Sequence, residues 1–282
     1  PYISVIIPAY NSTKFIAQCL KALEQSTYKS YEVILVDDGS TDDTAKIAKE
    51  MGCRVFIMER QSGPAVARNH GSEQAKGDIV LFIDSDVLVK SNTLELVAST
   101  FSENPQIAAL FGSYDDTPTD SGFLSQYRNL LHHYVHQNSN PDATTFWAGC
   151  GAVRRNIFLE LNGYDYKKFA EPSIEDIELG YRLRENGYKI RLDKDLQVTH
   201  LKHWSWYSMI KTDIFNRAIP WSRLILQTKS LPEDLNLRIS DRVSTAFVGI
   251  LLICIFFLFL GLLNLYNPFS NGLLLSITGV II

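Results

Sequence analysis

Short apolar runs alternate with amphipathic segments at the start of this chain, and this rhythm restricts the fold more than any other feature. The runs that predict buried strands are residues 3–7, 31–36, 54–58 and 78–83. The segments with helical spacing between them are residues 12–25, 41–51 and 63–75. Strands that alternate with helices in this way predict a doubly wound α/β fold with a mostly parallel sheet and right-handed crossovers.

The second half of the chain has a less regular pattern. Its predicted helices are residues 123–137, 155–161 and 174–185. Its predicted strands are residues 107–111, 189–192 and 197–199, with one or two further strands in residues 144–153. The 282 residues are enough for one sizeable α/β domain with an appendage.

Polar groups follow three of the predicted strands at the point where each strand ends. They are Tyr10 with Asn11, Asp37 with Asp38, and the sequence Asp84-Ser85-Asp86. The carboxyl ends of parallel strands meet at one edge of a sheet, and doubly wound folds bind their ligands there. The three groups together predict a binding site at that edge.

Asp84 and Asp86 leave a buried strand with one residue between them. Unpaired carboxylates in such a place are costly, and a hard divalent cation that also contacts phosphate oxygens is a suitable partner. The pair therefore suggests a Mg²⁺ or Mn²⁺ site that offsets negative charge on a departing diphosphate. A polar turn that caps the next helix is the alternative.

Glu175 and Asp176 form a second acidic pair, at the start of a predicted helix. One of these carboxylates suits a general base toward a hydroxyl acceptor, and the alternative is a favourable interaction with the helix dipole. His200 and His203 follow a strand end, where an imidazole can bind metal or phosphate. The residues alone leave these alternatives open.

Arg68 lies within the predicted helix 63–75, where it suits contact with a nucleotide or with the carboxylates that follow the strands. A surface salt bridge is the alternative. His132, His133 and His136 share another predicted helix. Because they lack the His-Glu-x-x-His pattern, we interpret them as a polar helix face and not as a zinc site.

Composition argues against several classes of protein. The formal net charge of −4 gives no reason to expect nucleic-acid binding. The four cysteines lie far apart in the sequence, which argues against a zinc site or a disulfide framework and fits a reducing compartment.

The end of the chain carries no charged residue after Arg242, and residues 245–263 are almost wholly apolar. Their length is close to the ~20 residues that a membrane-spanning helix needs, with a buried core helix as the alternative. Residues 264–268 predict a turn, and a second apolar run starts at Phe269 and continues to Ile282. We therefore expect a fragment of a longer, multi-pass membrane protein.

Basic residues upstream of the first predicted span, among them Arg238 and Arg242, place the amino-terminal domain on the cytoplasmic side by the positive-inside rule. Residues 204–229 interleave aromatic and basic residues, which favours helices in the membrane interface over helices packed on the domain. The predicted division is residues 1–203 for the α/β domain, 204–242 for the interface segment and 243–282 for the transmembrane region, with one full and one truncated span.

Seven short motifs in this order resemble those of the family 2 glycosyltransferases, whose GT-A fold is built on a Rossmann-like, mostly parallel sheet. The motifs are residues 5–11 (VIIPAYN), 36–42 (VDDGSTD), 63–69 (GPAVARN), 84–86 (DSD), 149–155 (GCGAVRR), 163–165 (GYD) and 175–176 (ED). The resemblance implies an inverting hexosyltransferase that uses Mg²⁺ or Mn²⁺ and a nucleotide-sugar donor, with a UDP-sugar favoured.

The resemblance also assigns roles by position. It implies a nucleotide pocket lined by Pro8, Tyr10, Asp38, Arg68, Asp84 and Ser85. It implies metal binding by Asp86 and His200, and it makes Asp176 the catalytic base with Glu175 in support.

Membrane-bound processive relatives carry a Gln-x-x-Arg-Trp motif after the base. Arg217 and Trp221 are present here, but their spacing differs and the glutamine is absent, so the case for processivity is weak. Arg217 remains a candidate contact to the donor diphosphate. The apolar end resembles relatives that glycosylate polyprenyl phosphates or other lipids, which implies a lipid or glycan acceptor at the bilayer.

Two readings from other classes stay open. A sugar-phosphate nucleotidyltransferase would carry a glycine-rich loop with Arg and Lys after the first strand, and residues 8–12 do not supply one. A non-catalytic nucleotide-sugar-binding scaffold for a membrane partner would have no need of both acidic pairs.

Overall fold

The computed structural model describes residues 1–169, 171–229, 235 and 239–265. It divides the chain into two compact units, Pro1–Leu235 and Asn236–Ile282. The first unit is the α/β domain with the helices that follow it, and the second contains α10. The two units are described separately below.

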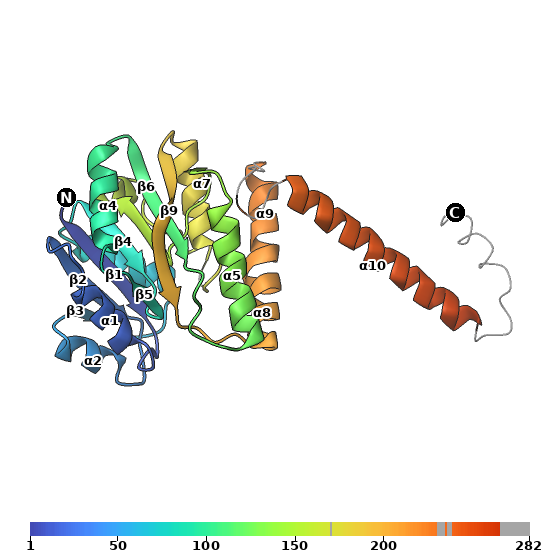
Figure 1. The fold of residues 1–282 in the computed structure, drawn as a ribbon, viewed down its shortest axis with the longest axis horizontal. Helices are drawn as coiled ribbons and strands as arrows, with labels where there is room; N and C mark the ends of the chain where they lie inside the picture. The colour runs from blue at the N-terminus through green and yellow to red at the C-terminus, as the bar shows by residue number, and fades with distance from the viewer. Residues whose placement is uncertain (170, 230–234, 236–238, 266–282) are drawn as a thin grey trace. The chain divides into compact units, whose positions relative to one another are not determined.

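A mixed sheet forms the centre of the first unit, with helices on both faces (Figure 1). Its strands are β1 (Ile3–Ala9), β2 (Tyr31–Asp37), β3 (Arg54–Ile57), β4 (Ile79–Ile83), β5 (Val87–Val89), β6 (Ile107–Tyr114), β7 (Asp142–Ala143), β8 (Cys150–Arg154) and β9 (Lys189–His200). Their order is β3-β2-β1-β4-β8-β6-β9-β5, and β7 pairs with β9. The pairs β1–β2, β1–β4, β2–β3 and β6–β9 are parallel, whereas β8 is antiparallel to both its neighbours. This confirms the predicted α/β class and its GT-A-like sheet.

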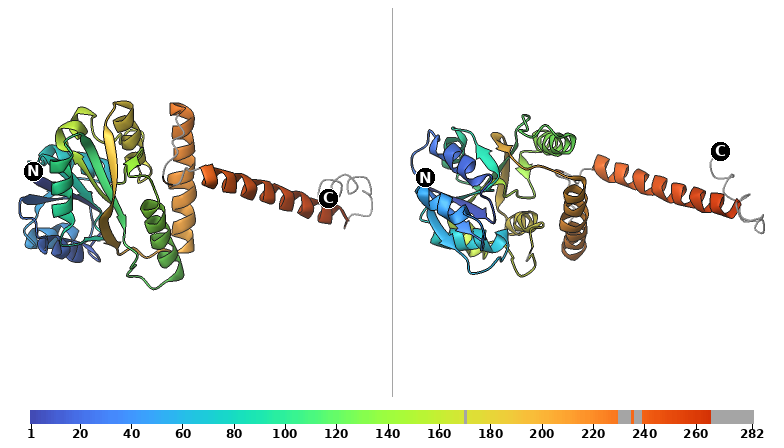
Figure 2. Two further views of the ribbon diagram at one scale, coloured as in Figure 1. Left: turned by 45° about the horizontal axis from the view of Figure 1, so that its top comes forward. Right: turned by 90° about the horizontal axis from the view of Figure 1, so that it is seen from below.

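The helices of the first unit are α1 (Ile16–Glu24), α2 (Thr44–Glu50), α3 (Pro64–Gln74), α4 (Thr93–Glu103), α5 (Phe123–Gln137), α6 (Arg155–Glu160), α7 (Glu175–Glu185), α8 (Trp206–Lys211), the π-helical η1 (Thr212–Ala218) and α9 (Ile219–Thr228). Figure 2 shows that α8, η1 and α9 run as one continuous helix beside α5. The predicted helix at 123–137 matches α5.

Alternating side chains of the strands fill two cores, one on each face of the sheet. Ile3, Val5 and Ile7 point into the core under α1, α2 and α4, whereas Ile6 points into the core under α3, α6 and α7. All four side chains are fully buried. Burial on both faces explains why β1 is apolar except at Ser4.

The structure differs from the sequence prediction in several elements, among them the short strand β7, which was not predicted. The segments 189–192 and 197–199 belong to one strand, β9, because β6 pairs with both across a register shift. The predicted strand at 144–153 reduces to β8, which begins only at Cys150. The short strand β5 and helix α4 were not anticipated.

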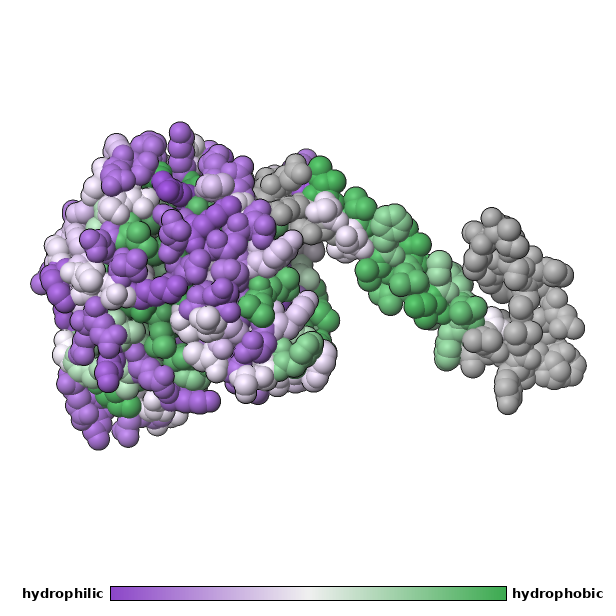
Figure 3. Space-filling view, in the orientation of Figure 1, coloured by the Kyte–Doolittle hydropathy of each residue, from purple (hydrophilic) through white to green (hydrophobic). Residues whose placement is uncertain are grey.

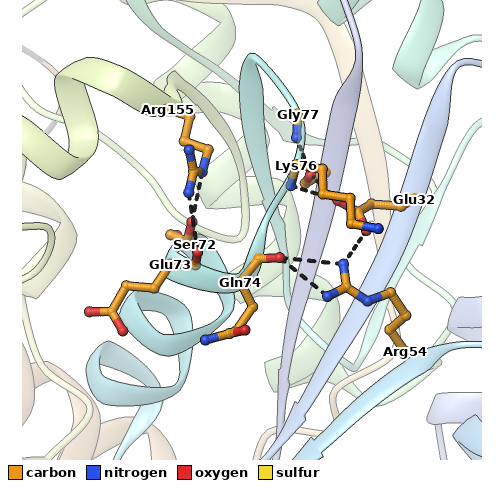
Figure 4. A network of polar contacts seen from close by, with 9 residues as sticks. Glu32, Arg54, Ser72, Glu73, Gln74, Lys76, Gly77 and Arg155 are labelled. Atoms are coloured by element: carbon orange, nitrogen blue, oxygen red, sulfur yellow. Dashed lines mark hydrogen bonds and ion pairs between the residues drawn. The ribbon is translucent and has the colours of Figure 1, made fainter.

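A polar network holds the end of α3 against the sheet (Figure 4). Glu32 on β2 accepts a hydrogen bond from the Lys76 amide at 2.8 Å and is ion-paired with Arg54. Arg54 also donates to the carbonyl of Gln74 at 3.3 Å, and Arg155 donates to carbonyls near the end of α3. These contacts fix the helix that carries Arg68, which is central to the site below.

In the second unit, α10 (Ile239–Leu265) contains the described stretch Arg242–Gly261, which by length and composition is able to cross a membrane, with a mean hydropathy of 2.8. The predicted turn at 264–268 begins too early, because Asn264 and Leu265 are still helical. The rest of that turn and the second apolar run, 269–282, lie outside the described residues.

Candidate active site

The loop after β4 carries Asp84, Ser85 and Asp86 at the carboxyl edge of the sheet. The Asp84 amide donates to the carbonyl of Gly149 just before β8 at 3.4 Å, which ties the loop to the strand beside it. The Ser85 hydroxyl lies 2.9 Å from the Ser12 hydroxyl, which belongs to the loop after β1. The carboxyl ends of β1 and β4 therefore meet where the sequence predicts.

Arg68 joins the two acidic motifs. Its Nη2 lies 2.7 Å from Asp84 Oδ1, and its Nη1 lies 3.1 Å from Glu175 Oε1. Burial alone would lower the pKa of Arg68, but the carboxylates of Asp84 and Glu175 outweigh burial and raise it. The side chain is buried, so a surface salt bridge is excluded.

Asn69 fixes the position of Arg68 from the neighbouring residue. Its side-chain amide bonds both the N–H and the C=O of Tyr164, each at 2.8 Å. The Tyr164 ring then lies 5.7 Å from the Arg68 guanidinium. The motifs at 63–69 and 163–165 therefore contact each other, through Asn69 and Arg68 on one side and Tyr164 on the other.

Asp176 lies in the first turn of α7, next to Glu175. It accepts hydrogen bonds from the Ala148 amide at 3.1 Å and from the Ile177 amide at 2.8 Å. Burial, followed by repulsion from Glu175, raises the pKa of Asp176 to about 6. Its carboxylate is therefore more basic than an ordinary aspartate and still ionised at neutral pH.

A glycine brings α7 close enough for this contact. A Cβ atom on Gly180 would lie 2.5 Å from the backbone nitrogen of Phe146. Gly180 follows Asp176 by four residues, so the two share one helix face. That face packs on the segment that contains Ala148, and a larger residue at Gly180 would push the Asp176 carboxylate away from it.

Asp86 directly precedes β5 and His200 ends β9, and the two strands pair at this point. Their Oδ2 and Nε2 atoms are 3.5 Å apart, and the His200 ring stacks on Tyr114 with centroids 4.3 Å apart. Burial alone would raise the pKa of Asp86, but hydrogen bonding and the charges of His200 and Lys202 outweigh it and lower the pKa.

The chemistry of this pair fits a divalent cation that is shared with a ligand. Within the described ranges, no group of three or more His, Cys, Asp or Glu side chains is placed to hold a metal ion by itself. Mg²⁺-type sites commonly use one or two protein carboxylates and complete the shell with phosphate oxygens and water. Asp86 with His200 suits a site of that kind.

Asp38 is buried and already has partners. Its Oδ1 accepts from the Ser62 amide and its Oδ2 from the Gly63 amide, both at 2.8 Å. Burial is the largest influence and raises the pKa of Asp38 despite these bonds. Asp38 therefore shapes the loop that leads into α3.

The remaining predicted residues lie around this centre. Pro8 pairs with Val36 inside the sheet, and Tyr10 is exposed just beyond the end of β1. Arg217 lies in η1 with an exposed side chain, and its charge acts to lower the pKa of Asp176. Arg217 is thus on the same side of the molecule as the second acidic pair.

Sequence reasoning missed the aromatic column behind His200. Tyr114 stacks between His200 and His132, whose ring contacts Trp147 with centroids 4.5 Å apart. His136 is buried and bonds the Gly112 carbonyl at 2.8 Å, so the histidines of α5 face the sheet and are not a polar surface. The available signal was the position of Tyr114 at the end of an apolar strand.

The family described as "Glycosyl transferase family 2" matches residues 4–161, more than half of the chain. The chain belongs to glycosyl transferase family 2. The matched part contains Asp38, Arg68, Asp84 and Asp86, whereas Glu175, Asp176, His200 and Arg217 lie beyond it. The match therefore covers the first acidic motif and Arg68 but ends before α7.

Curated relatives of this family 2 chain include glycosyltransferase GlyG of Streptococcus pneumoniae, 34% identical over 126 residues, which are 43% of this chain and 42% of GlyG. Glycosyltransferase AglE of Haloferax volcanii is 40% identical over 109 residues, 36% of each chain. The chain thus matches less than half the length of these relatives.

Solved structures share the fold of this family 2 chain. A mannosyltransferase from Pyrobaculum calidifontis in complex with GDP-Man and Mn²⁺ superposes with a TM-score of 0.61 at 22% identity, over 75% of this chain and 60% of that one. TarS 1-349 of S. aureus in complex with UDP-GlcNAc gives 0.56 at 23% identity, over 74% and 61%. At these identities the likeness concerns the fold.

Proposed function

We propose that this chain transfers a sugar from a nucleotide-diphosphate donor to a hydroxyl or phosphate acceptor with inversion at the anomeric carbon. The observation that carries the proposal is the pairing of Arg68 with both Asp84 and Glu175, which brings the two acidic motifs to one site. Membership of family 2 supports it.

Asp176 is the catalytic base in this proposal. A hydroxyl acceptor gives its proton to the Asp176 carboxylate while its oxygen bonds to the anomeric carbon. The bond from that carbon to the diphosphate breaks, and its electron pair leaves with the diphosphate. One displacement from the opposite face inverts the carbon, and a base with a pKa of about 6 is ionised at neutral pH for this task. That raised pKa favours an enzyme over a scaffold.

Asp86 and His200 would hold Mg²⁺ or Mn²⁺, which supplies neutralisation of the charge on the leaving diphosphate. The Mn²⁺ in the solved mannosyltransferase complex supports this choice of group. Tyr114 orients the His200 ring toward Asp86, and Arg217 adds positive charge on the acceptor side of the site.

The donor pocket of the proposal is lined by Pro8, Tyr10, Asp38, Asp84 and Ser85. Asp38 keeps free lone pairs on both oxygens after accepting one amide each, which leaves capacity for a base or ribose. A UDP-sugar is our first choice because TarS was solved with UDP-GlcNAc and with UDP, although the mannosyltransferase was solved with GDP-Man.

The proposal includes one membrane span. Helix α10 crosses the bilayer, the amino-terminal unit lies on the cytoplasmic side, and the acceptor is a lipid or lipid-linked glycan. The length and hydropathy of Arg242–Gly261 and the basic residues before it support this arrangement.

Turnover of a panel of nucleotide sugars by the full chain in lipid nanodiscs, with and without Mn²⁺, tests the proposal. Mn²⁺-dependent release of nucleoside diphosphate is the expected result. Release of pyrophosphate would instead indicate a nucleotidyltransferase, and no release from any donor would reject catalysis.

A further inference from the structure

Exposed apolar side chains concentrate on one part of the first unit. Twelve of its fifteen exposed large hydrophobic residues that the structure describes belong to α5 or to the continuous helix α8–η1–α9. They include Phe123, Tyr127 and Tyr134 on α5, and Trp206, Tyr207 and Phe215 on the other helix. Figure 3 shows hydrophobic side chains on the side of this unit where α5 and α8 lie. Soluble monomers rarely expose apolar groups in such concentration.

The two helices form one surface because they are joined side by side. Arg128 of α5 is ion-paired with Asp213 of η1 at 2.7 Å, and its guanidinium lies 5.0 Å from the Trp204 ring. The Trp204 amide donates to Ser125 Oγ of α5 at 2.9 Å. We call the outer side of α5 and α8–η1–α9 the aromatic face.

The charge of the aromatic face is opposite to that of the whole chain. Residues 200–229 contain five lysines and arginines and one acid, whereas the chain has a net charge of −4. The acid is Asp213, and Arg128 neutralises it. Cations at the border of an aromatic surface are attracted to anionic phosphate headgroups.

We infer that the aromatic face docks on an anionic lipid bilayer. Trp and Tyr prefer the boundary between headgroups and acyl chains, and lysine and arginine complement the phosphates there. Helix α10, which is long and apolar enough to span a bilayer, is the next described helix in sequence and begins at Ile239. The predicted interface segment 204–242 thus acquires α5 as a second element; its residues 230–234 and 236–238 lie outside the described ranges.

The docked helix also supports the catalytic half of the site. Ser173, just before Glu175, donates its hydroxyl to the Asn216 carbonyl of η1 at 2.9 Å. Trp221 Nε1 donates to the Tyr181 hydroxyl of α7 at 3.2 Å. Lipid contact on the outer side of this helix therefore sets α7 next to the membrane surface, where an amphiphilic acceptor would be reached.

Native tryptophan fluorescence tests the inference. All four tryptophans, Trp147, Trp204, Trp206 and Trp221, lie in the first unit, so α10 contributes no signal. The full chain is placed in nanodiscs of phosphatidylglycerol with brominated or unbrominated phosphatidylcholine, since bromine quenches nearby indoles. We expect brominated lipid to lower the emission, Trp206→Phe to lose most of this quenching, and Trp147→Phe to keep it.

Charge variants provide the second measurement. Lys211→Glu and Arg223→Glu each remove one basic charge and add an acidic one, so each should lower the ratio of docked to undocked protein at least about fivefold. Lys46→Glu on the exposed side of α2 is the matched control and should change nothing. Absence of quenching, or equal quenching in the parent and Trp206→Phe, would overturn the inference. The readout needs neither donor nor acceptor, so it is independent of the proposed sugar transfer.

Discussion

Arg68 Nη1 lies 3.1 Å from Glu175 Oε1, so α3 is ion-paired with the first residue of α7 across 107 positions of sequence. The other terminal nitrogen of the same guanidinium reaches Asp84. One buried cation thus pairs with an acid from the loop after β4 and with an acid from α7. Any change at Arg68 is felt in both halves of the site.

Replacing Arg68 should destabilise the fold and alter the pH profile together. Arg68→Gln leaves Glu175 buried without its partner, and we expect a loss of about 3–5 kcal/mol in the free energy of unfolding. Because Arg68 acts to lower the pKa of Asp176, the acid limb of turnover should move to higher pH. Denaturant titration and the pH dependence of kcat measure the two effects.

The control for Arg68 is Arg184→Ala. Arg184 pairs with the exposed Asp142 at 2.9 Å, so its removal should cost at most about 1 kcal/mol and leave the pH profile unchanged. Equal effects of the two variants would contradict a special role for the buried pair. Arg68→Lys should retain only part of the stability that Arg68→Gln loses, because a single ammonium group cannot pair with Asp84 and Glu175 as the two guanidinium nitrogens do.

Asp176→Asn should abolish sugar transfer and leave donor affinity almost unchanged. The side chain keeps its size while losing the basic oxygen, so we expect turnover to fall at least about 10²-fold. Product formation and calorimetric donor binding measure the two quantities. Asp142→Asn, an exposed acid outside the site, should behave like the parent. Turnover near the parental rate would remove Asp176 from the base role.

The raised pKa of Asp176 also predicts a stability trend. The protonated carboxyl stabilises the fold below about pH 4, and this contribution is lost as pH rises through about 6. Asp176→Asn does not titrate, so its stability relative to the parent should increase by up to about 3 kcal/mol between pH 4 and pH 8. Melting curves at several pH values measure the trend, and a difference independent of pH would contradict the raised pKa.

Asp86→Asn and His200→Gln should each weaken metal-dependent donor binding by about tenfold or more, because they remove the two side chains assigned to the cation. Titration calorimetry with Mn²⁺ and with excess chelator separates metal-dependent from metal-independent affinity. His203→Gln is the control, since His203 is exposed and pairs with Asp120 at 2.8 Å. Full Mn²⁺ dependence in the first two variants would refute this assignment.

Gly180→Ala should test whether the position of Asp176 matters for turnover, because it displaces α7 without changing the Asp176 carboxylate. The new methyl group would meet the backbone of Thr145 and Phe146 at 2.5–2.6 Å, so α7 has to move. We expect a loss of about 1–3 kcal/mol in stability and a lower kcat with an unchanged KM for donor. Gly187→Ala lies in open space at the end of α7 with φ +79°, so it should lower stability without the effect on kcat.

Sequence was sufficient to place the polar groups at the sheet edge because these residues follow apolar strands directly. The apolar run at 78–83 predicts a buried strand, and the parallel sheet of a doubly wound fold puts the residues after that strand, Asp84 and Asp86, at its carboxyl edge. The dual pairing of Arg68 was beyond reach, since nothing local relates it to Glu175. The same holds for the Tyr114 column, which depends on β6 and β9 pairing across the sheet.

The surroundings of single polar residues could not be predicted from the sequence, because they depend on which side chains the fold buries. Asp38 is predicted to face a ligand, yet both its carboxylate oxygens accept hydrogen bonds from amides before α3. His136 fitted a polar face, yet it bonds a sheet carbonyl. Helical spacing shows which residues share one face of a helix. It does not show whether that face contacts water or another element of the fold.

The π-helical turn η1 closes with a bond from the Ile219 amide to the Ile214 carbonyl, five residues back. A chain one residue shorter at this point would wind as an ordinary α-helix, and everything after it would turn by about 100° about the axis. Trp221 would then swing away from Tyr181. Deletion of one residue in η1 would therefore leave α7 and α9 intact as helices but would break the contact between them.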